Sequence, residues 1–163
     1  MSNIPVDPKI AALKEDLRRV FPAVTYHGPI TTADGRWTPE LDDDQDVYEH
    51  LKGLSWPQAP TSLMLRQPDG YLLLADAAFT AFLPAWLMLS LERAEEHEDE
   101  IREFLIYSFS STLRQFRLLN PEQRELVRSI IAEFHLRITD AFVKSSAKEA
   151  LELIDRLAQQ DAT

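Results

Sequence analysis

The chain has 163 residues, of which 45% are hydrophobic and 27% are charged, and these values are typical of one globular domain with a single core. Its formal net charge of −10 repels nucleic acid phosphates and anionic lipid head groups, so we expect neither nucleic acid nor a membrane as a partner. The absence of cysteine excludes disulfides, thiolate catalysis and thiolate metal sites.

Composition favours helices, because tight hairpins depend on glycine and the chain has only four glycines beside ten prolines. We therefore expect an all-α fold, a single compact domain of five or six helices over residues 1–163. Its ordered core would cover residues 5–160, between short disordered termini. The first residues lack a basic segment followed by an apolar one, so the expected location is the cytoplasm.

The first predicted helix runs from Asp7 to Phe21, with Pro8 at its first position and an apolar stripe of helical spacing. Pro22 ends this helix. Residues 23–41 mix glycine, proline, threonine and aromatic residues without a regular period. They predict an ordered loop with room for a short strand.

A second helix is predicted in "DDDQDVYEHLKGL", where the acidic side chains of 42–44 meet the positive end of the helix dipole. Gly53 suits the end of this helix. The next segment has two interpretations. Pro57 and Pro60 can open a short helix, whereas residues 62–74 can pair as a hairpin across "PDG". The short helix is preferred.

An apolar run covers Tyr71–Leu91, with Asp76 as its only charged residue. Crossing a bilayer takes about 20 apolar residues, which the run just reaches. However, "QPDG" signals a turn before it, and Asp76 suits a helix N-cap. The remaining stretch of about 15 residues predicts a buried core helix instead of a membrane span.

Pro84 lies inside this predicted helix, where it removes one backbone hydrogen bond. We expect the helix to kink or restart there, so the fold would have a proline-kinked, buried central helix. The aromatic side chains of Phe79, Phe82 and Trp86 surround the break. They predict core packing, with a small binding pocket as the alternative.

The sequence "LNPEQ" is the clearest helix start in the chain, with Asn120 as N-cap and Gln123 completing a capping box. From there one apolar face continues as far as Phe142, which predicts a single helix of about five turns. Ser145 or Ser146 is the predicted N-cap of the last helix.

Motifs for catalysis, metals and cofactors are missing. The aspartates of "DDDQDVYEH" alternate as in a calcium loop, but Val47 replaces the turn glycine and Gly53 replaces the bidentate glutamate. Asp46 and His50 share a helical face and supply only two metal ligands. No catalytic dyad or glycine-rich phosphate loop is present, so we expect no enzyme activity, no cofactor and no metal.

Three segments, "LKGLSW", "LLLADAAFTAFLPAWL" and "LNPEQRELVRSII", together resemble a family of small bacterial domains of unknown function with a YLPAyL core motif. The resemblance covers about Lys9 to Phe142. Phe82 stands where the family more often has tyrosine, and Asp76 and Ala77 replace what is commonly a proline and an acid. The resemblance implies a shared fold and carries no activity. The positions that match the motif are Phe79, Leu83, Pro84, Ala85 and Leu87.

Negative charge is concentrated in two short stretches, Glu40–Glu49 and Glu92–Glu103. Such clustering predicts a surface that attracts a basic protein partner, as in an immunity protein that blocks a toxin or an inhibitor of a nucleic acid enzyme. The predicted partner-binding residues are Asp43, Asp44, Asp46, Glu49, Glu95, Glu96 and Glu98.

Two alternatives remain at this point. A structural subunit would oligomerise through exposed apolar residues of the last helices. An enzyme would need a site near Pro84, Trp56 and Trp86, for which the sequence names no catalytic pair. The sequence leaves the oligomeric state open.

Overall fold

The computed structural model describes residues 7–96, 99–111 and 116–162, so residues 1–4, part of the expected disordered termini, lie outside it. The described part is all-α and contains no strand, as the composition predicts. It holds seven α-helices, more than the five or six expected. They are α1 (Pro8–Val20), α2 (Asp42–Leu51), α3 (Thr61–Arg66), α4 (Asp76–Glu92), α5 (Glu100–Ser111), α7 (Pro121–Arg137) and α8 (Ala141–Asp161).

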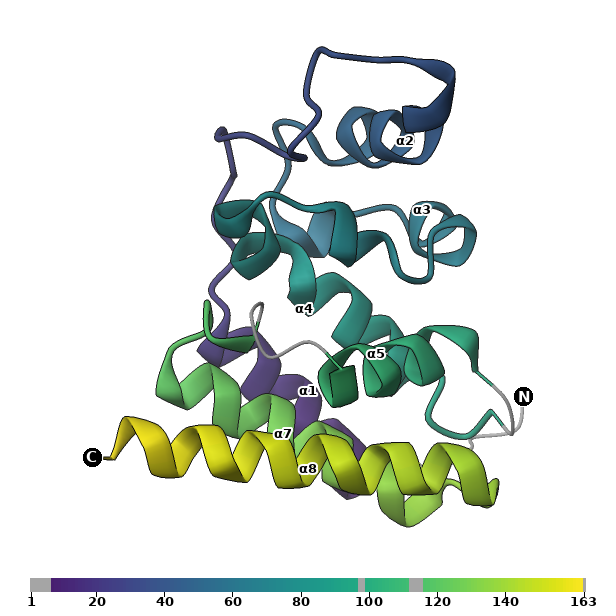
Figure 1. Cartoon of the computed structure of the whole chain (residues 1–163), viewed down its shortest axis with the longest axis vertical. Helices are drawn as coiled ribbons and strands as arrows, with labels where there is room; N and C mark the ends of the chain where they lie inside the picture. Colours follow the sequence, from purple (N-terminus) through teal and green to yellow (C-terminus); the bar gives the residue numbers. More distant parts are fainter. Residues whose placement is uncertain (1–6, 97–98, 112–115, 163) are drawn as a thin grey trace.

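Helix α4 passes through the middle of the molecule and links its two ends (Figure 1). At one end, α8 packs against α5 and α7, and α1 packs against α7 and α4. At the other end, α2 contacts α3 and a 3₁₀ turn at Gly70–Leu73, which in turn contacts α4. Surface features at the α2 end therefore lie far from those on α8.

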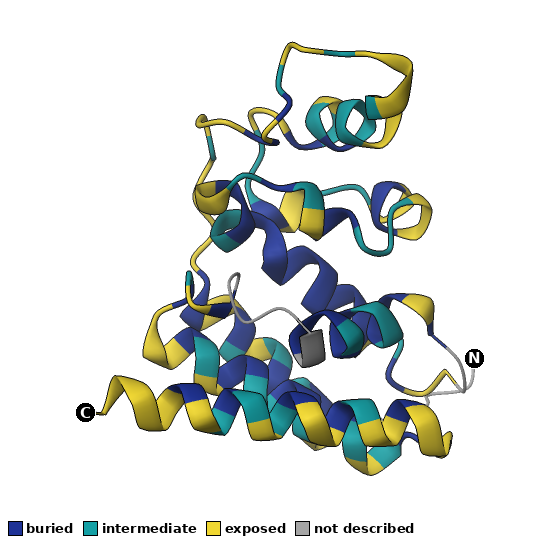
Figure 2. Cartoon of the chain, in the orientation of Figure 1, coloured by how far each residue is buried: buried dark blue, intermediate teal, exposed yellow. Residues whose placement is uncertain are grey.

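The core is centred on α4, in which every residue from Phe82 to Leu91 is buried (Figure 2). Asp76 is the first residue of this helix and not its N-cap, which is Ala75. The helix does not restart at Pro84, because it is continuous from Asp76 to Glu92. None of the helices in the described residues combines the length and the apolar character needed to cross a bilayer.

The aromatic residues around Pro84 pack into this core. Phe79, Phe82 and Trp86 are at most 1% exposed. The indole Nε1 of Trp86 donates to the carbonyl oxygen of Gln67 at 3.0 Å, so its one polar group is satisfied. These side chains therefore fill the interior around Pro84, which is itself buried.

The preferred short helix is confirmed, because α3 occupies residues 61–66 and no hairpin forms over residues 62–74. The loop of residues 23–41 is ordered by Asp34, whose carboxylate accepts from the backbone N–H of Ile30 at 2.7 Å and of Thr31 at 2.8 Å. Instead of a strand it contributes a single antiparallel bridge from Thr31 to Leu74.

The junction between α7 and α8 differs from the prediction. The capping box is confirmed, with Gln123 N donating to Asn120 Oδ1 at 2.8 Å and Asn120 N donating to Gln123 Oε1 at 3.0 Å. However, α7 ends at Arg137, so the single helix expected to continue to Phe142 is wrong. The N-cap of α8 is Asp140, not Ser145 or Ser146.

The Asp140 side chain explains this break. Its Oδ1 accepts from the backbone N–H groups of Phe142 and Val143, both at 3.0 Å. Those bonds satisfy N–H groups that would otherwise continue the α7 ladder, and Ile138 takes an extended conformation with ψ of 132°. A strong local cap thus starts a new helix inside a continuous apolar pattern.

Candidate functional site

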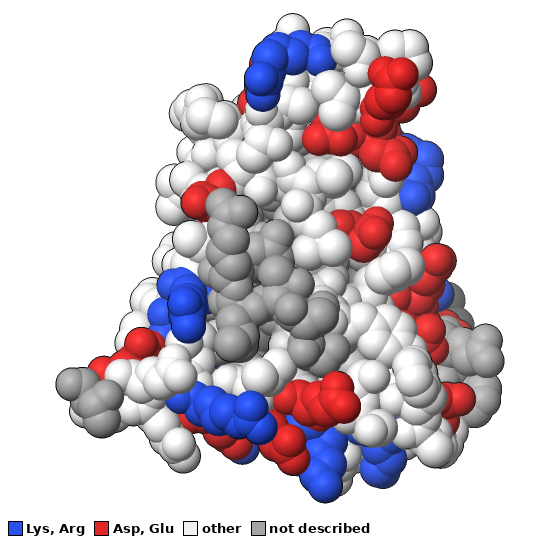
Figure 3. All heavy atoms as spheres, in the orientation of Figure 1, with Lys and Arg blue, Asp and Glu red and all other residues white. Residues whose placement is uncertain are grey.

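The first acidic stretch lies on α2 and on the 3₁₀ turn before it, Pro39–Leu41. Six of the ten residues from Glu40 to Glu49 are acidic and none is basic. Residues 42–44 occupy the first helical turn, where their charges favour the helix dipole. Figure 3 shows acidic side chains gathered over this end of the molecule.

Asp46 is held within the molecule by residues of α3 and its end. Arg66 donates to both carboxylate oxygens, Nη2 to Oδ1 at 2.9 Å and Nε to Oδ2 at 3.2 Å, and Gln67 Nε2 donates to Oδ2 at 3.2 Å. The Nδ1 of His50 lies 3.0 Å from Oδ1. The hydrogen bond from Arg66 lowers the pKa of Asp46 below its usual value, against the opposing effect of burial. Asp46 therefore anchors α2 to α3.

The other acidic side chains of α2 have no such cation. Asp43 accepts from the neutral amide of Gln67 at 3.0 Å, and Glu49 accepts from that of Gln45 at 3.2 Å. Within the described residues, no ion pair reaches the four that we call the acidic surface of α2. These four are Asp42, Asp43, Asp44 and Glu49.

This lack of cations contrasts with the other end of the molecule. There, Asp155 pairs with Arg128 at 2.6 Å, and Lys9 pairs with the buried Glu133 at 2.8 Å. Arginines and lysines of the protein therefore offset acidic side chains on α7 and α8. On α2, by contrast, four acidic side chains have no ion pair with any described residue.

The second acidic stretch is only partly available. Glu95 pairs with Arg137 at 2.9 Å, although its side chain is 77% exposed, and Asp99 is buried against Arg93 at 3.0 Å. Glu96 is exposed. Glu98 lies outside the described residues. An exposed pair such as Glu95 with Arg137 is screened by solvent, so Glu95 and Glu96 both present charge at the surface.

The two stretches do not merge into one patch. Glu95 and Glu96 lie in the connection between α4 and α5, whereas α2 lies at the far end of the molecule, beyond α3 (Figure 1). Both lie along the same edge in this view, where Figure 3 shows acidic atoms in an interrupted band. A partner that contacts both would have to span the length of α3 and α4.

The region near Pro84, Trp56 and Trp86, where the sequence would place an enzyme site, contains several hollows. Trp56 lines three hollows next to α4, of about 90 Å³, 240 Å³ and 350 Å³, together with mainly apolar neighbours. Its Nε1 donates to the carbonyl oxygen of Phe21 at 2.7 Å, which makes it structural. Among the described residues, no group of three or more His, Asp or Glu side chains is placed to hold a metal ion.

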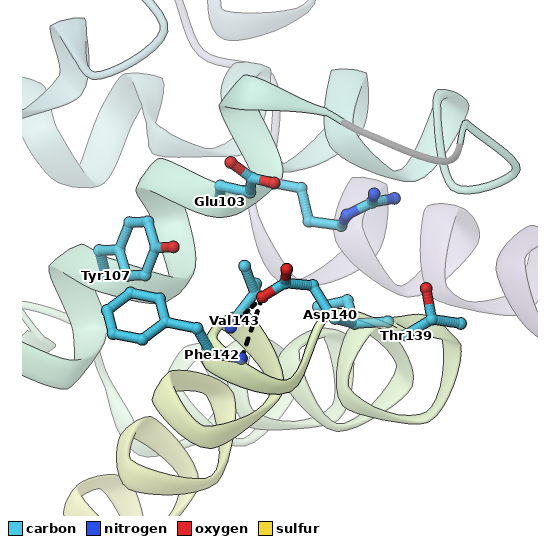
Figure 4. Close-up of a pocket in the computed structure, with 8 residues that line it drawn as sticks. Glu103, Tyr107, Thr139, Asp140, Phe142 and Val143 are labelled. Atoms are coloured by element: carbon cyan, nitrogen blue, oxygen red, sulfur yellow. Dashed lines mark hydrogen bonds between the residues drawn. The ribbon is translucent and has the colours of Figure 1, made fainter.

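Sequence reasoning missed a further pocket, which lies between α5 and the start of α8 and has a volume of about 410 Å³. Figure 4 shows Glu103 and Tyr107 on α5 facing the turn that carries Thr139 and Asp140, with Phe142 beside Tyr107. Its lining comes from segments more than 30 residues apart, so no local motif marks it. The lining residues are Arg102, Glu103, Tyr107, Ile138, Thr139, Asp140, Phe142 and Val143.

Comparison with known proteins gives no family: no family model, no curated protein and no solved structure matches the chain.

Proposed function

We propose that the protein binds a basic protein partner through the acidic surface of α2, as an immunity protein or an inhibitor does when it neutralises a positively charged target. The observation that supports this proposal is the set of four acidic side chains on α2 that have no cation within the described residues. Glu95 and Glu96 would add a second, weaker contact for a partner long enough to reach them.

Electrostatics explains why such a surface serves binding. Clustered like charges repel one another in the folded protein, and solubility alone does not require them to be adjacent. A partner with a complementary patch relieves this repulsion, and the attraction acts over a Debye length of about 10 Å before contact. The main effect is on the rate of association.

Asp46 differs from the other acidic residues of α2 because it already has a cationic partner within the protein. Its carboxylate already accepts two hydrogen bonds from Arg66, so a lysine at this position would face Arg66 and loosen α3. Experiments on binding should therefore leave Asp46 intact and change exposed residues only. Asp42, Asp43 and Glu49 are exposed.

The test compares two triple variants with the same change of net charge. The first replaces the α2 residues, D42N/D43N/E49Q. The control replaces exposed acids of α7 and α8, E125Q/E149Q/E152Q. A basic partner captured from the native host is then measured against both variants by biosensor kinetics over a range of salt concentrations.

We expect the α2 variant to associate about tenfold more slowly at low salt, with a flatter salt dependence and a nearly unchanged dissociation rate. The control should associate like the wild type. Equal slowing of both variants would reduce the effect to net charge, and no slowing of either would remove the α2 surface from the proposal.

A structural subunit is the second candidate, favoured by two exposed apolar side chains. Leu136 is 66% exposed and Phe142 is 72% exposed, on either side of the α7–α8 turn. If this turn is a contact between copies, wild-type protein should form oligomers by light scattering, and Leu136→Ser should shift them to monomers. Monomeric wild-type protein at all concentrations would exclude this candidate.

A further inference from the structure

Gln67 directly follows α3, and its backbone is fixed on both sides. Its N–H donates to the carbonyl oxygen of Leu63 at 2.8 Å. Its own carbonyl oxygen accepts from the N–H of Gly70 at 2.9 Å and from Nε1 of Trp86 at 3.0 Å. Because Trp86 is fully buried on α4, these bonds tie the backbone of Gln67 to the core.

Gly70 allows three segments to meet closely beside Gln67. A Cβ atom on Gly70 would lie 2.9 Å from Cβ of Gln67, 3.1 Å from Cζ2 of Trp86 and 3.4 Å from Cγ2 of Val47 on α2. The first of these distances is too short for a Cβ contact, so the close approach depends on glycine. The Gln67 side chain therefore starts from a fixed point next to α2.

The side-chain amide of Gln67 bridges two carboxylates of α2. Its Nε2 donates to Oδ1 of Asp43 at 3.0 Å and to Oδ2 of Asp46 at 3.2 Å. Asp46 also has its ion pair with Arg66. Asp43 belongs to the acidic surface of α2, and the bond from Gln67 is the only hydrogen bond to its side chain within the described residues.

We propose that Gln67 is a positioning residue for partner binding, which holds the Asp43 carboxylate in one orientation on the acidic surface of α2. This inference rests on the proposed function, because the orientation of Asp43 matters for binding only if a cation reaches that surface. Glutamine is neutral, so Gln67 acts on the geometry of the surface and leaves its charge unchanged.

A carboxylate that is already oriented binds a cation more tightly than a mobile one. An exposed side chain loses rotamer freedom when a partner immobilises it, and this loss opposes binding. The hydrogen bond from Gln67 restricts Asp43 before the partner arrives, so less freedom is lost on binding. The attraction at a distance depends on charge alone and stays the same without the amide.

Gln67 does not take the place of a partner on Asp43. Its amide donates to Oδ1, and no described residue donates a hydrogen bond to Oδ2. An ionised carboxylate accepts hydrogen bonds on both oxygens. A guanidinium or ammonium group of the partner can therefore bind Oδ2 while Gln67 stays on Oδ1, and bonds between ionised groups are the stronger kind.

The test removes the amide without changing charge or side-chain length. Gln67→Met does this, and Gln159→Met changes an exposed glutamine of α8 as the control. Asp43→Asn and the double variant Gln67→Met/Asp43→Asn complete a cycle. The probe is a capped peptide of four arginines, titrated at several salt concentrations while the backbone amides of residues 42–49 are followed by NMR. Thermal melts should show that all variants fold cooperatively.

In the free protein, three-bond couplings should show one χ1 rotamer for Asp43 in the wild type and averaged rotamers in Gln67→Met. Gln67→Met should lower the affinity for the peptide about threefold and keep the salt dependence of the wild type. Asp43→Asn should lower the affinity and flatten the salt dependence. Adding Gln67→Met to Asp43→Asn should cause no further loss. Gln159→Met should bind like the wild type.

Three results would each overturn the role of Gln67. They are an unchanged Asp43 rotamer in Gln67→Met, an unchanged affinity in that variant, and an equal loss of affinity when the change is made on Asp43→Asn. The last result would show that Gln67 acts on the fold and not through Asp43. If the peptide does not bind residues 42–49 of the wild type, the proposed function is contradicted instead. The couplings in the free protein then still decide whether Gln67 orients Asp43.

Discussion

Arg137, the last residue of α7, donates from Nη2 to the Oδ2 of Asp7 at 2.6 Å, and so closes a contact between residues 130 positions apart. The same Asp7 is the N-cap of α1, where its Oδ1 accepts from Lys9 N at 2.9 Å. Arg137 also donates from Nε to the buried Glu133 at 2.9 Å. One arginine thus connects the start of α1 to the end of α7.

This contact predicts a stability difference that depends on pH. The hydrogen bond from Arg137 lowers the pKa of Asp7, and hydrogen bonds from Lys9 and Arg137 lower that of Glu133 in spite of burial. Groups with a lowered pKa in the folded state stabilise it above their unfolded pKa of about 4, and this stabilisation is lost as the pH falls through the folded value.

We therefore expect Arg137→Gln to unfold at lower urea concentration than the wild type at pH 7, with the difference shrinking below about pH 4. Urea titrations from pH 7 to pH 2.5 measure this. Arg156→Gln, which changes an exposed arginine of α8, is the control for charge. A difference that stays constant down to pH 2.5 would show that the carboxylates are not responsible.

Because Asp140 caps the start of α8, its replacement should lower the stability of the protein. Asp140→Ala should lower the free energy of unfolding by about 1 kcal/mol, because two backbone N–H groups lose their acceptor. That corresponds to a melting temperature lower by roughly 2–4 °C. Ser145→Ala lies inside α8 and should change it little. A lower melting temperature for Ser145→Ala than for Asp140→Ala would indicate that the N-cap of α8 is the serine expected from the sequence.

Whether the fold tolerates replacement of an aromatic residue by aspartate depends on how deeply that residue is buried. Trp86 is 0% exposed and Phe142 is 72% exposed. Trp86→Asp places an unpaired carboxylate in the core, which costs several kcal/mol and should abolish the folded state. Phe142→Asp should leave the helical circular dichroism spectrum and cooperative melting intact. A folded Trp86→Asp protein would contradict the placement of α4.

Local sequence signals are sufficient to predict structure where the conformation of a segment depends only on residues close to it in the chain. Pro8 and Asn120 mark the starts of α1 and α7, because capping depends on residues three or fewer positions away. The apolar run of α4 likewise predicts its own burial, since a helix that is apolar on every side is stable only inside the protein.

Contacts between distant segments could not be predicted in this way. The apolar pattern continues through Ile138, Ala141 and Phe142, so periodicity hides the break that the Asp140 side chain makes. Phe142 was expected on the inner face of a helix, yet it is exposed beside a pocket. The pairing of Asp46 with Arg66 depends on how α3 packs against α2, which no spacing reveals.

The position of α1 has a consequence for how the chain folds as it is synthesised. Its apolar face, with Leu13 and Leu17, packs against α4 and α7. Residues 121–137 leave the ribosome only after about 100 further residues have followed α1. Until then the part of this face that packs against α7 has no partner, and a short isolated helix is marginal in water. The first helix should therefore become stable late, and nascent chains that stop before residue 121 should expose it to chaperones and proteases.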